Sequence, residues 1–333
     1  MIAPFDKKYT DYIIVAVVSV VPILAQVLLS GIGATALCAN WIASGLFAWM
    51  IWNIIEVNHL GIFKRNHAFP ISWALISMVL NFALINFNEY KDGTLAAERW
   101  YDIDKFQWYY LIQMLGLLLI IMTMMQTWQN KIATLPLIFC GLITGAVSTL
   151  LNYSLFWLLF FPIILYQLRS LSKQNLGSIL TGVVLAIWLC YVGRFFLFGI
   201  DNADQHFLSY TKILDHLIPD YIDYTRWEWV FIGYIAILII IYSIAGLTNN
   251  VANSVKAYSS IIMLSILSFI ITIIAIIDIS HLENYLGIIA ILLSFQVSIH
   301  QSYINSAKNE WWTIAIIAGL AILSIVSLFS FIF

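Results

Sequence analysis

Residues 258–277 read YSSIIMLSILSFIITIIAII, a run of twenty residues without a charged side chain. A helix of about 20 apolar residues is long enough to cross the hydrocarbon core of a bilayer. Comparable stretches occupy most of the 333-residue chain, and none carries a charge in its middle. They predict an all-α polytopic transmembrane helix bundle of about eleven spans, near 12–30, 34–56, 68–87, 107–126, 132–151, 154–168, 176–193, 227–247, 258–277, 285–299 and 311–331.

The composition also indicates a membrane protein. Hydrophobic residues make up 62% of the chain and charged residues 10%, whereas soluble domains have roughly 45–50% and 25%. Eleven spans leave little room for a soluble domain, so we expect a single transmembrane domain over residues 1–333. The run after Lys7 and Lys8 is longer than the core of a signal peptide, and we interpret it as a retained first helix. The net charge of −2 gives no reason to expect a nucleic-acid partner.

Lysine and arginine positions predict the orientation, because short cytoplasmic loops carry an excess of both. With the N-terminus inside, the inner loops contain Lys7, Lys8, Lys64, Arg65, Lys131, Arg169, Lys173, Lys256 and Lys308. The outer loops contain Lys91, Arg99, Lys105, Arg194, Lys212 and Arg226. These outer cations all lie in or beside two long loops, and long loops translocate largely regardless of charge. The pattern favours an N-in, C-out protein.

Polar side chains within the spans are uncharged. They are Gln26, Asn40, Asn53, Asn81, Gln113 and Gln296. The lack of a central ionisable residue argues against an ion-coupled transporter. We expect the amides to make hydrogen bonds between helices.

Small residues in the spans are interpreted as packing residues. Gly141 and Gly145 form a GxxxG pattern, which favours close packing between helices of the monomer over a dimer face. Cys38, Cys140 and Cys190 lie in apolar stretches without metal-ligand spacing, so they too are expected to pack.

Two long outer loops are predicted at about 88–106 and 194–226. In the first, Thr94 to Lys105 is compatible with a short helix in a solvated, salt-bridged loop. In the second, residues at about 205–218 have apolar side chains on one helical face and polar side chains largely on the opposite face, which is typical of an amphipathic helix lying in the membrane interface.

Arginines in these loops are the candidate phosphate-binding residues, namely Arg194, Arg226 and Arg99. A guanidinium group binds phosphate through paired hydrogen bonds. The alternative for each is an arginine that reaches toward lipid headgroups without a further role. The candidate acids and bases are Asp201, Asp204, Asp223 and Glu228.

No cofactor-binding or nucleophile motif stands in a suitable context, so no cofactor is predicted. Asp278, His281 and Glu283 have a spacing compatible with metal ligands. A solvated connection between helices explains the same residues better, and we predict no metal site.

One long segment resembles a known family. Residues 135–188 read LPLIFCGLITGAVSTLLNYSLFWLLFFPIILYQLRSLSKQNLGSILTGVVLAIW. They resemble an uncharacterised family of bacterial polytopic inner-membrane proteins, in which a glycine-bearing helix leads through a short break to an aromatic-rich helix and a basic loop. The turns LGIFKRNHAFP (60–70) and NSAKNEWW (305–312) are also similar. The resemblance covers about half of the chain and implies a multi-pass protein of the bacterial inner (plasma) membrane, without naming catalytic residues.

Two positions depart from that family. Cys140 stands where an acidic residue is frequent, and Ile187-Trp188 where the family has a proline. The same helix pair is distantly similar to polyprenyl-linked-sugar glycosyltransferases and O-antigen-type polymerases. Those glycosyltransferases place an acid in the first outer loop, which here is Gly31-Ile32-Gly33. The polymerases use arginines in two large outer loops, as this chain has.

Three hypotheses for function remain open, and only the first makes the protein an enzyme. The first is an envelope-associated protein that acts at the outer face of the inner membrane on a lipid-linked sugar or lipid phosphate. The second is a non-enzymatic subunit or scaffold of an envelope complex. The third is an uncoupled lipid or small-molecule transporter, with Asn40, Asn53, Asn81 or Gln113 lining a cavity at mid-membrane.

Overall fold

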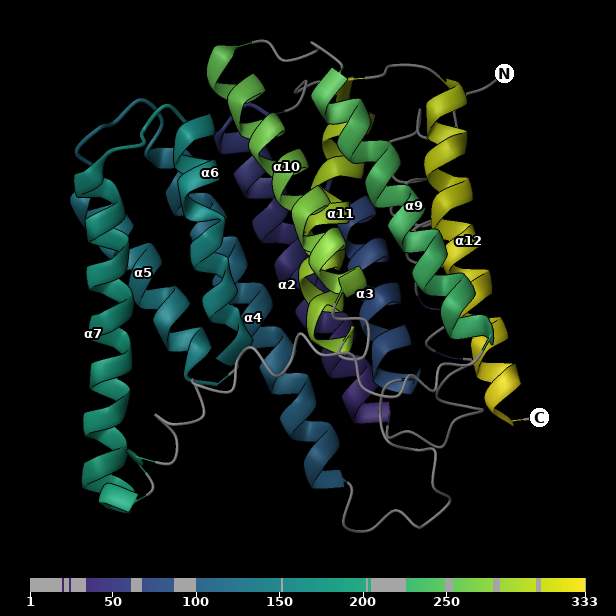
Figure 1. Cartoon of the computed structure of the whole chain (residues 1–333). Coiled ribbons are helices and arrows are strands. Elements are labelled where there is room, and N and C mark those ends of the chain that lie inside the picture. The colour runs from purple at the N-terminus through teal and green to yellow at the C-terminus, as the bar shows by residue number, and fades with distance from the viewer. Residues whose placement is uncertain are drawn as a thin grey trace. The chain divides into compact units, whose positions relative to one another are not determined.

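The computed structural model describes residues 20, 24, 34–60, 68–86, 100–150, 152–201, 203–204, 226–248, 254–277, 282–303 and 307–332. Every regular element among them is helical (Figure 1), which confirms the all-α prediction. Four helices in these ranges are long and apolar enough to cross a membrane: α7 (Lys173–Phe198), α9 (Arg226–Thr248), α10 (Val255–Ile277) and the Tyr285–Ser302 part of α11 (Glu283–Tyr303). By length and composition, the chain is a membrane protein.

The other described elements are α2 (Ala34–Val57), α3 (Ala68–Asn86), α4 (Trp100–Gln126), α5 (Thr134–Ser148), the 3₁₀ helix η3 (Asn152–Leu159), α6 (Phe161–Gln167) and α12 (Ala307–Ile332). Each segment predicted from 34–56 onward falls on a helix. The segment 12–30 lies outside the described ranges apart from two positions. The count of eleven spans and the N-in, C-out orientation remain predictions.

Several helix boundaries differ from the sequence-based prediction, most at the start of α4 and the end of α7. Helix α4 begins at Trp100 rather than 107, and α7 continues to Phe198 rather than 193. The predicted boundaries lie where the apolar residues end, but a helix can continue beyond that point into polar sequence. The segment 154–168 is divided between η3 and α6, with Pro162 in the first turn of α6. Proline favours a helix start, because its nitrogen cannot donate to a preceding turn.

The chain forms two compact units. Unit 1 contains Met1–Leu111, Asp223–Thr272 and Glu283–Phe333, and unit 2 contains Ile112–Ile222 and Ile273–Leu282. Helices α4 and α10 therefore contribute residues to both units.

Helix α11 is the central helix of unit 1. Within the apolar stretch of α11 that is long enough to span a membrane, 89% of the residues are buried, compared with 28% in the corresponding stretch of α9. It packs against α2, α3, α9 and α12. Buried side chains join it to these neighbours: Ser298 Oγ lies 3.1 Å from Ser72 Oγ on α3, and the Gln296 amide donates to Ser243 Oγ on α9 at 3.0 Å. The prediction that the amides link helices is confirmed at Gln296.

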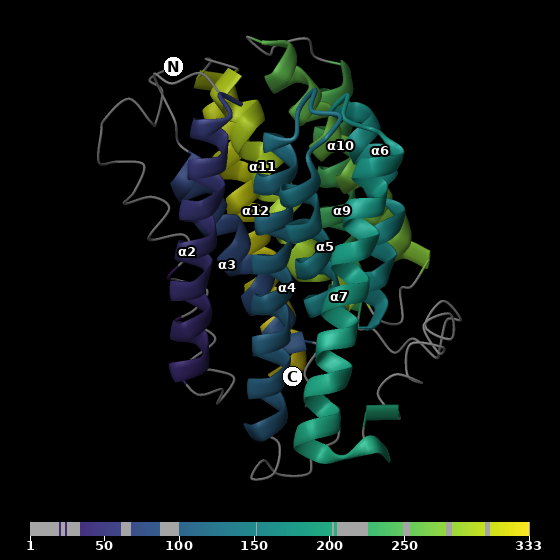
Figure 2. The ribbon, with the colours of Figure 1, turned by 90° about the vertical axis from the view of Figure 1, so that its left-hand side faces the viewer.

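Unit 2 is organised around α5 and α7, which run parallel along a seam of small residues (Figures 1 and 2). A methyl group added to Gly141 would collide with the carbonyl oxygen of Ile179, and one added to Gly145 would lie 2.6 Å from the Ala186 Cβ. Gly182 faces the Ile138 carbonyl in the same way. The GxxxG pattern therefore packs within the monomer, as predicted.

A buried asparagine joins the chain segments that precede α5 and α7. The Asn175 Oδ1 accepts from the Ala133 N–H at 3.0 Å, and its Nδ2 donates to the carbonyls of Asn130 at 3.0 Å and Ser170 at 2.6 Å. The Ser172 hydroxyl caps α7 by accepting from the Asn175 N–H, and it donates to the Lys131 carbonyl at 2.8 Å. Residues 127–133 and 168–173, which we call the paired turns, therefore form one hydrogen-bonded layer.

Replacing Gly182 with alanine should destabilise the protein, by about 1–3 kcal/mol, because the added methyl overpacks the seam. Gly177→Ala, in the same helix, is the matched control, since nothing lies within 4 Å of a methyl at that position. This control should leave the free energy of unfolding unchanged or raise it by about 0.4–1 kcal/mol, because alanine lowers the conformational entropy of the unfolded chain. Thermal unfolding of the detergent-solubilised protein measures both. Equal effects of the two variants would show that the seam is not tightly packed.

Asn175→Ala should lower stability by about 3 kcal/mol or more, because it leaves three backbone groups without partners. Gln174→Ala changes the adjacent, exposed residue, whose side chain makes one bond of 3.4 Å, and should change stability by less than about 0.5 kcal/mol. The same unfolding measurement compares them. If Asn175→Ala lowers stability only slightly, water replaces the hydrogen bonds of Asn175, and the backbone of the paired turns is accessible to solvent.

Candidate functional site

The C-terminal end of α7 gathers three of the predicted site residues. Helix α7 ends at Gly199, whose φ of +85° and ψ of 172° belong to a region that is essentially reserved for glycine. The chain then turns back, and the Ala203 N–H donates to the Gly199 carbonyl at 3.3 Å. This return brings Asp204 to the helix, where its Oδ1 accepts from the Tyr191 hydroxyl at 2.8 Å. We call residues 191–201 and 203–204 the α7 tip.

Arg194 lies on the same face of α7 as Tyr191, because residues three apart are neighbours on a helix surface. Arg194 is partly buried, whereas Asp201 and Asp204 are exposed. The α7 tip therefore combines one guanidinium group with two carboxylates, one of which is held by a phenol. Tyr191 was not among the predicted site residues, although its spacing from Arg194 was visible in the sequence.

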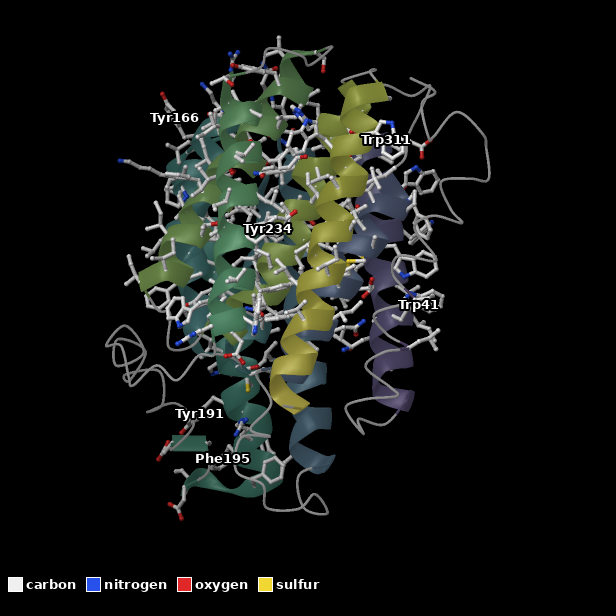
Figure 3. The ribbon with its side chains drawn as sticks, turned by 90° about the vertical axis from the view of Figure 1, so that its right-hand side faces the viewer. Trp41, Tyr166, Tyr191, Phe195, Tyr234 and Trp311 are labelled. Carbon is white, nitrogen blue, oxygen red and sulfur yellow. The ribbon has the colours of Figure 1, made fainter. Side chains whose placement is uncertain are left out.

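Apolar side chains surround this polar group. Phe196, Leu197 and Phe198 are 77%, 76% and 68% exposed. Figure 3 shows Phe195 beside Tyr191 at one end of unit 2 and Tyr166 at the other end. Exposed aromatic residues at the end of a membrane-spanning helix are typical of the interface between hydrocarbon and headgroups. The polar groups of the α7 tip therefore lie on a helix whose last turn is apolar and exposed.

The predicted site residues in unit 1 lie at the start of α9. Arg226 is exposed, whereas Glu228 in the same first turn is 3% exposed. A carboxylate at this position is stabilised by the positive end of the helix dipole. Exposed Trp227 and Trp229 flank Glu228, as expected for an interface.

The structure thus places Arg194, Asp201 and Asp204 together in unit 2, and Arg226 and Glu228 together in unit 1. Arg99 and Asp223 lie outside the described residues, as do the predicted amphipathic helix 205–218 and the first part of the predicted loop 88–106, whose residues 100–106 belong to α4. The predicted convergence of the three arginines on one phosphate remains a prediction.

The described ranges contain no group of three His, Cys, Asp or Glu side chains that can hold a metal ion. Asp278 and His281 fall outside those ranges. Cys140 is buried on α5 and Cys190 is half-buried on α7, and both are free thiols.

Comparisons of the chain with protein-family models, with curated proteins and with solved structures each find no match. The resemblance to a family of inner-membrane proteins therefore stays a prediction. The function has to be argued from the chemistry of the α7 tip.

Gly199→Ala should open the α7 tip, because alanine is strained by about 1–3 kcal/mol at this backbone conformation. Hydrogen exchange at the Ala203 amide should become faster, since its bond to the Gly199 carbonyl depends on the turn. Gly193→Ala is the matched control in the same helix, with nothing within 4 Å of the added methyl. Unchanged exchange at Ala203 in Gly199→Ala would contradict the described turn.

Proposed function

We propose that this protein acts at the outer face of the bacterial inner membrane on a lipid-linked sugar or a lipid phosphate, with the α7 tip as the headgroup site. The observation that carries the proposal is the return of Asp204 to Tyr191, which joins a carboxylate to the helix turn that precedes Arg194, near the end of a helix long enough to span a membrane.

The roles follow from the chemistry of these groups. Arg194 binds phosphate or pyrophosphate oxygens, because a guanidinium group donates two parallel hydrogen bonds to them. Asp204, oriented by the Tyr191 hydroxyl, accepts the proton of the hydroxyl or water that attacks the lipid-linked sugar. The bond between the sugar and the phosphate breaks, and the lipid phosphate leaves bound to Arg194. The exposed Phe196 and Phe198 contact the first methylene groups of the lipid chain. Asp201 is a second carboxylate within reach of the same headgroup.

Arg226 and Glu228 form a second charged group, at the start of α9 in unit 1. There the arginine is exposed, and the carboxylate two residues later is buried between two exposed tryptophans. The proposed headgroup site at the α7 tip does not depend on them.

A transporter is the second candidate. Asn81 on α3 is 2% exposed, and its side-chain oxygen has no hydrogen-bond partner within the described structure. A buried acceptor without a donor is costly, and the hydroxyl of an uncharged substrate would satisfy it. Under this alternative, Asn81→Leu abolishes transport while Arg194→Ala has little effect.

The test is a mass-spectrometric profile of lipid-linked envelope intermediates in cells that lack the protein and in cells that carry single variants. We expect one intermediate to accumulate both in the deletion strain and in Arg194→Ala, and to accumulate less in Arg194→Lys, which keeps the charge but loses the paired hydrogen bonds. Lys256→Ala, which removes a cation from the first turn of α10, should match the wild type.

If the intermediate accumulates in the deletion strain but not in Arg194→Ala, Arg194 does not bind the substrate. A deletion profile identical to the wild type would overturn the lipid-substrate proposal. Co-purification of partner proteins would then test the remaining hypothesis of an assembly subunit.

A further inference from the structure

The paired turns carry three exposed cations, Lys131, Arg169 and Lys173. The two turns lie together at the end of unit 2 where α5 and α7 begin (Figures 1 and 2). This is the end of α7 opposite to the α7 tip, at a distance of about 39 Å for a helix of 26 residues. The cations therefore belong to a surface that the proposed function does not use.

Hydrogen bonds hold the backbone beneath these cations in one arrangement. The Gln129 N–H donates to the Leu168 carbonyl at 2.9 Å, in addition to the bonds of Asn175 and Ser172. Arg169 has a φ of +55°, and the next N–H, of Ser170, donates back to the Leu165 carbonyl at 2.9 Å to close the end of α6. The three charges are thus presented at fixed backbone positions, without the ordering cost of a flexible basic loop.

The described residues of unit 2 supply no negative charge at this end. The sequence from Lys105 to Ile200 contains no Asp or Glu. Helix N-termini favour acidic residues, because the helix dipole is positive there, yet the first turns of α5 and α7 contain none. Lys131 lies just before α5, and Lys173 is the first residue of α7, where a cation is unfavourable. Three cations beside two helix N-termini make this surface electrostatically complementary to an anion.

Apolar residues next to the cations indicate what kind of anion binds. Ile132 follows Lys131 and is 66% exposed, and Leu135 in the first turn of α5 is 81% exposed. Tyr166 and Leu171, on either side of Arg169, are 72% and 42% exposed. A free phosphate ion gains nothing from such side chains, whereas the acyl chains of a lipid bury them.

We propose that the paired turns bind the phosphate of an anionic phospholipid, with its acyl chains against Ile132 and Leu135. Lysine and arginine form charge-assisted hydrogen bonds to the phosphate oxygens, and clustered cations at a membrane border favour anionic over zwitterionic lipids. The site is independent of the α7 tip and is predicted on the cytoplasmic side, whereas the proposed substrate site is on the outer side.

The test is binding of defined lipids to the purified full-length protein by native mass spectrometry. The probes are phosphatidylglycerol, phosphatidylcholine with the same acyl chains, and inorganic phosphate. We expect phosphatidylglycerol to be bound in preference to phosphatidylcholine. The variant Lys131→Gln/Arg169→Gln/Lys173→Gln should bind phosphatidylglycerol about 100-fold more weakly, from a contribution of about one factor of five for each cation near an anionic lipid surface.

Two controls separate a defined site from a general effect of charge. Lys256→Gln removes a cation from the start of α10 in unit 1 and should leave the affinity within about twofold of wild type. The triple variant should unfold at a temperature no lower than that of the lipid-free wild type, because all three side chains are exposed and the bonds of Asn175 are unchanged.

Two outcomes would overturn the proposal: equal binding of the two lipids by the wild type, or unchanged phosphatidylglycerol binding by the triple variant. Nonspecific attraction would be indicated if the single variant Lys256→Gln lost as much affinity for phosphatidylglycerol as an average cation of the triple variant, that is, one-third of the triple variant's loss on a logarithmic scale. This result would also overturn the proposal. Competition by inorganic phosphate at concentrations equal to those of the lipid would show that a free anion is the ligand.

Discussion

Hydrocarbon offers no hydrogen bonds, so each polar group of a membrane-embedded chain has to be satisfied by the protein itself. This constraint accounts for the helical backbone and for how its polar side chains are used. Buried Ser and Thr hydroxyls such as Ser294, Ser268 and Thr144 donate back to the carbonyl four residues earlier in their own helix. Gln296 and Ser298 instead reach neighbouring helices, and they do so from α11, which is largely buried among the other helices of unit 1.

The same constraint explains the construction of unit 2. Where α5 and α7 approach closely, Gly141, Gly145 and Gly182 leave no side chain between the backbones. Where the chain leaves the helices and its backbone groups lose their helical partners, Asn175 supplies both donors and an acceptor to three of them. One side chain thus replaces the bonds that water would make in a soluble loop.

The parallel arrangement of α5 and α7 gives the two ends of unit 2 different chemistry. Both helices begin at the paired turns, so two positive dipole ends and three cations lie together there. Helix α5 has 15 residues and α7 has 26, so α7 continues well beyond the end of its partner, as Figure 2 shows. Its last turns carry Arg194, Tyr191 and the exposed phenylalanines, and Gly199 returns Asp204 to them. Both ends of unit 2 therefore carry cations, whereas its described carboxylates, Asp201 and Asp204, lie at the α7 tip.

The sequence by itself determined the membrane environment, the helical class and the packing role of Gly141 and Gly145, because these follow from hydropathy and from spacing along one helix. It also identified Arg194 and Asp204 as chemically suited to a site. Only the tertiary structure decided that Tyr191 holds Asp204, since that bond depends on the backbone turn at Gly199. Likewise, only the structure showed that Lys131 and Lys173, 42 positions apart in the sequence, lie on paired turns. Hydropathy reports how each residue interacts with lipid, whereas contacts between distant segments depend on how the helices pack.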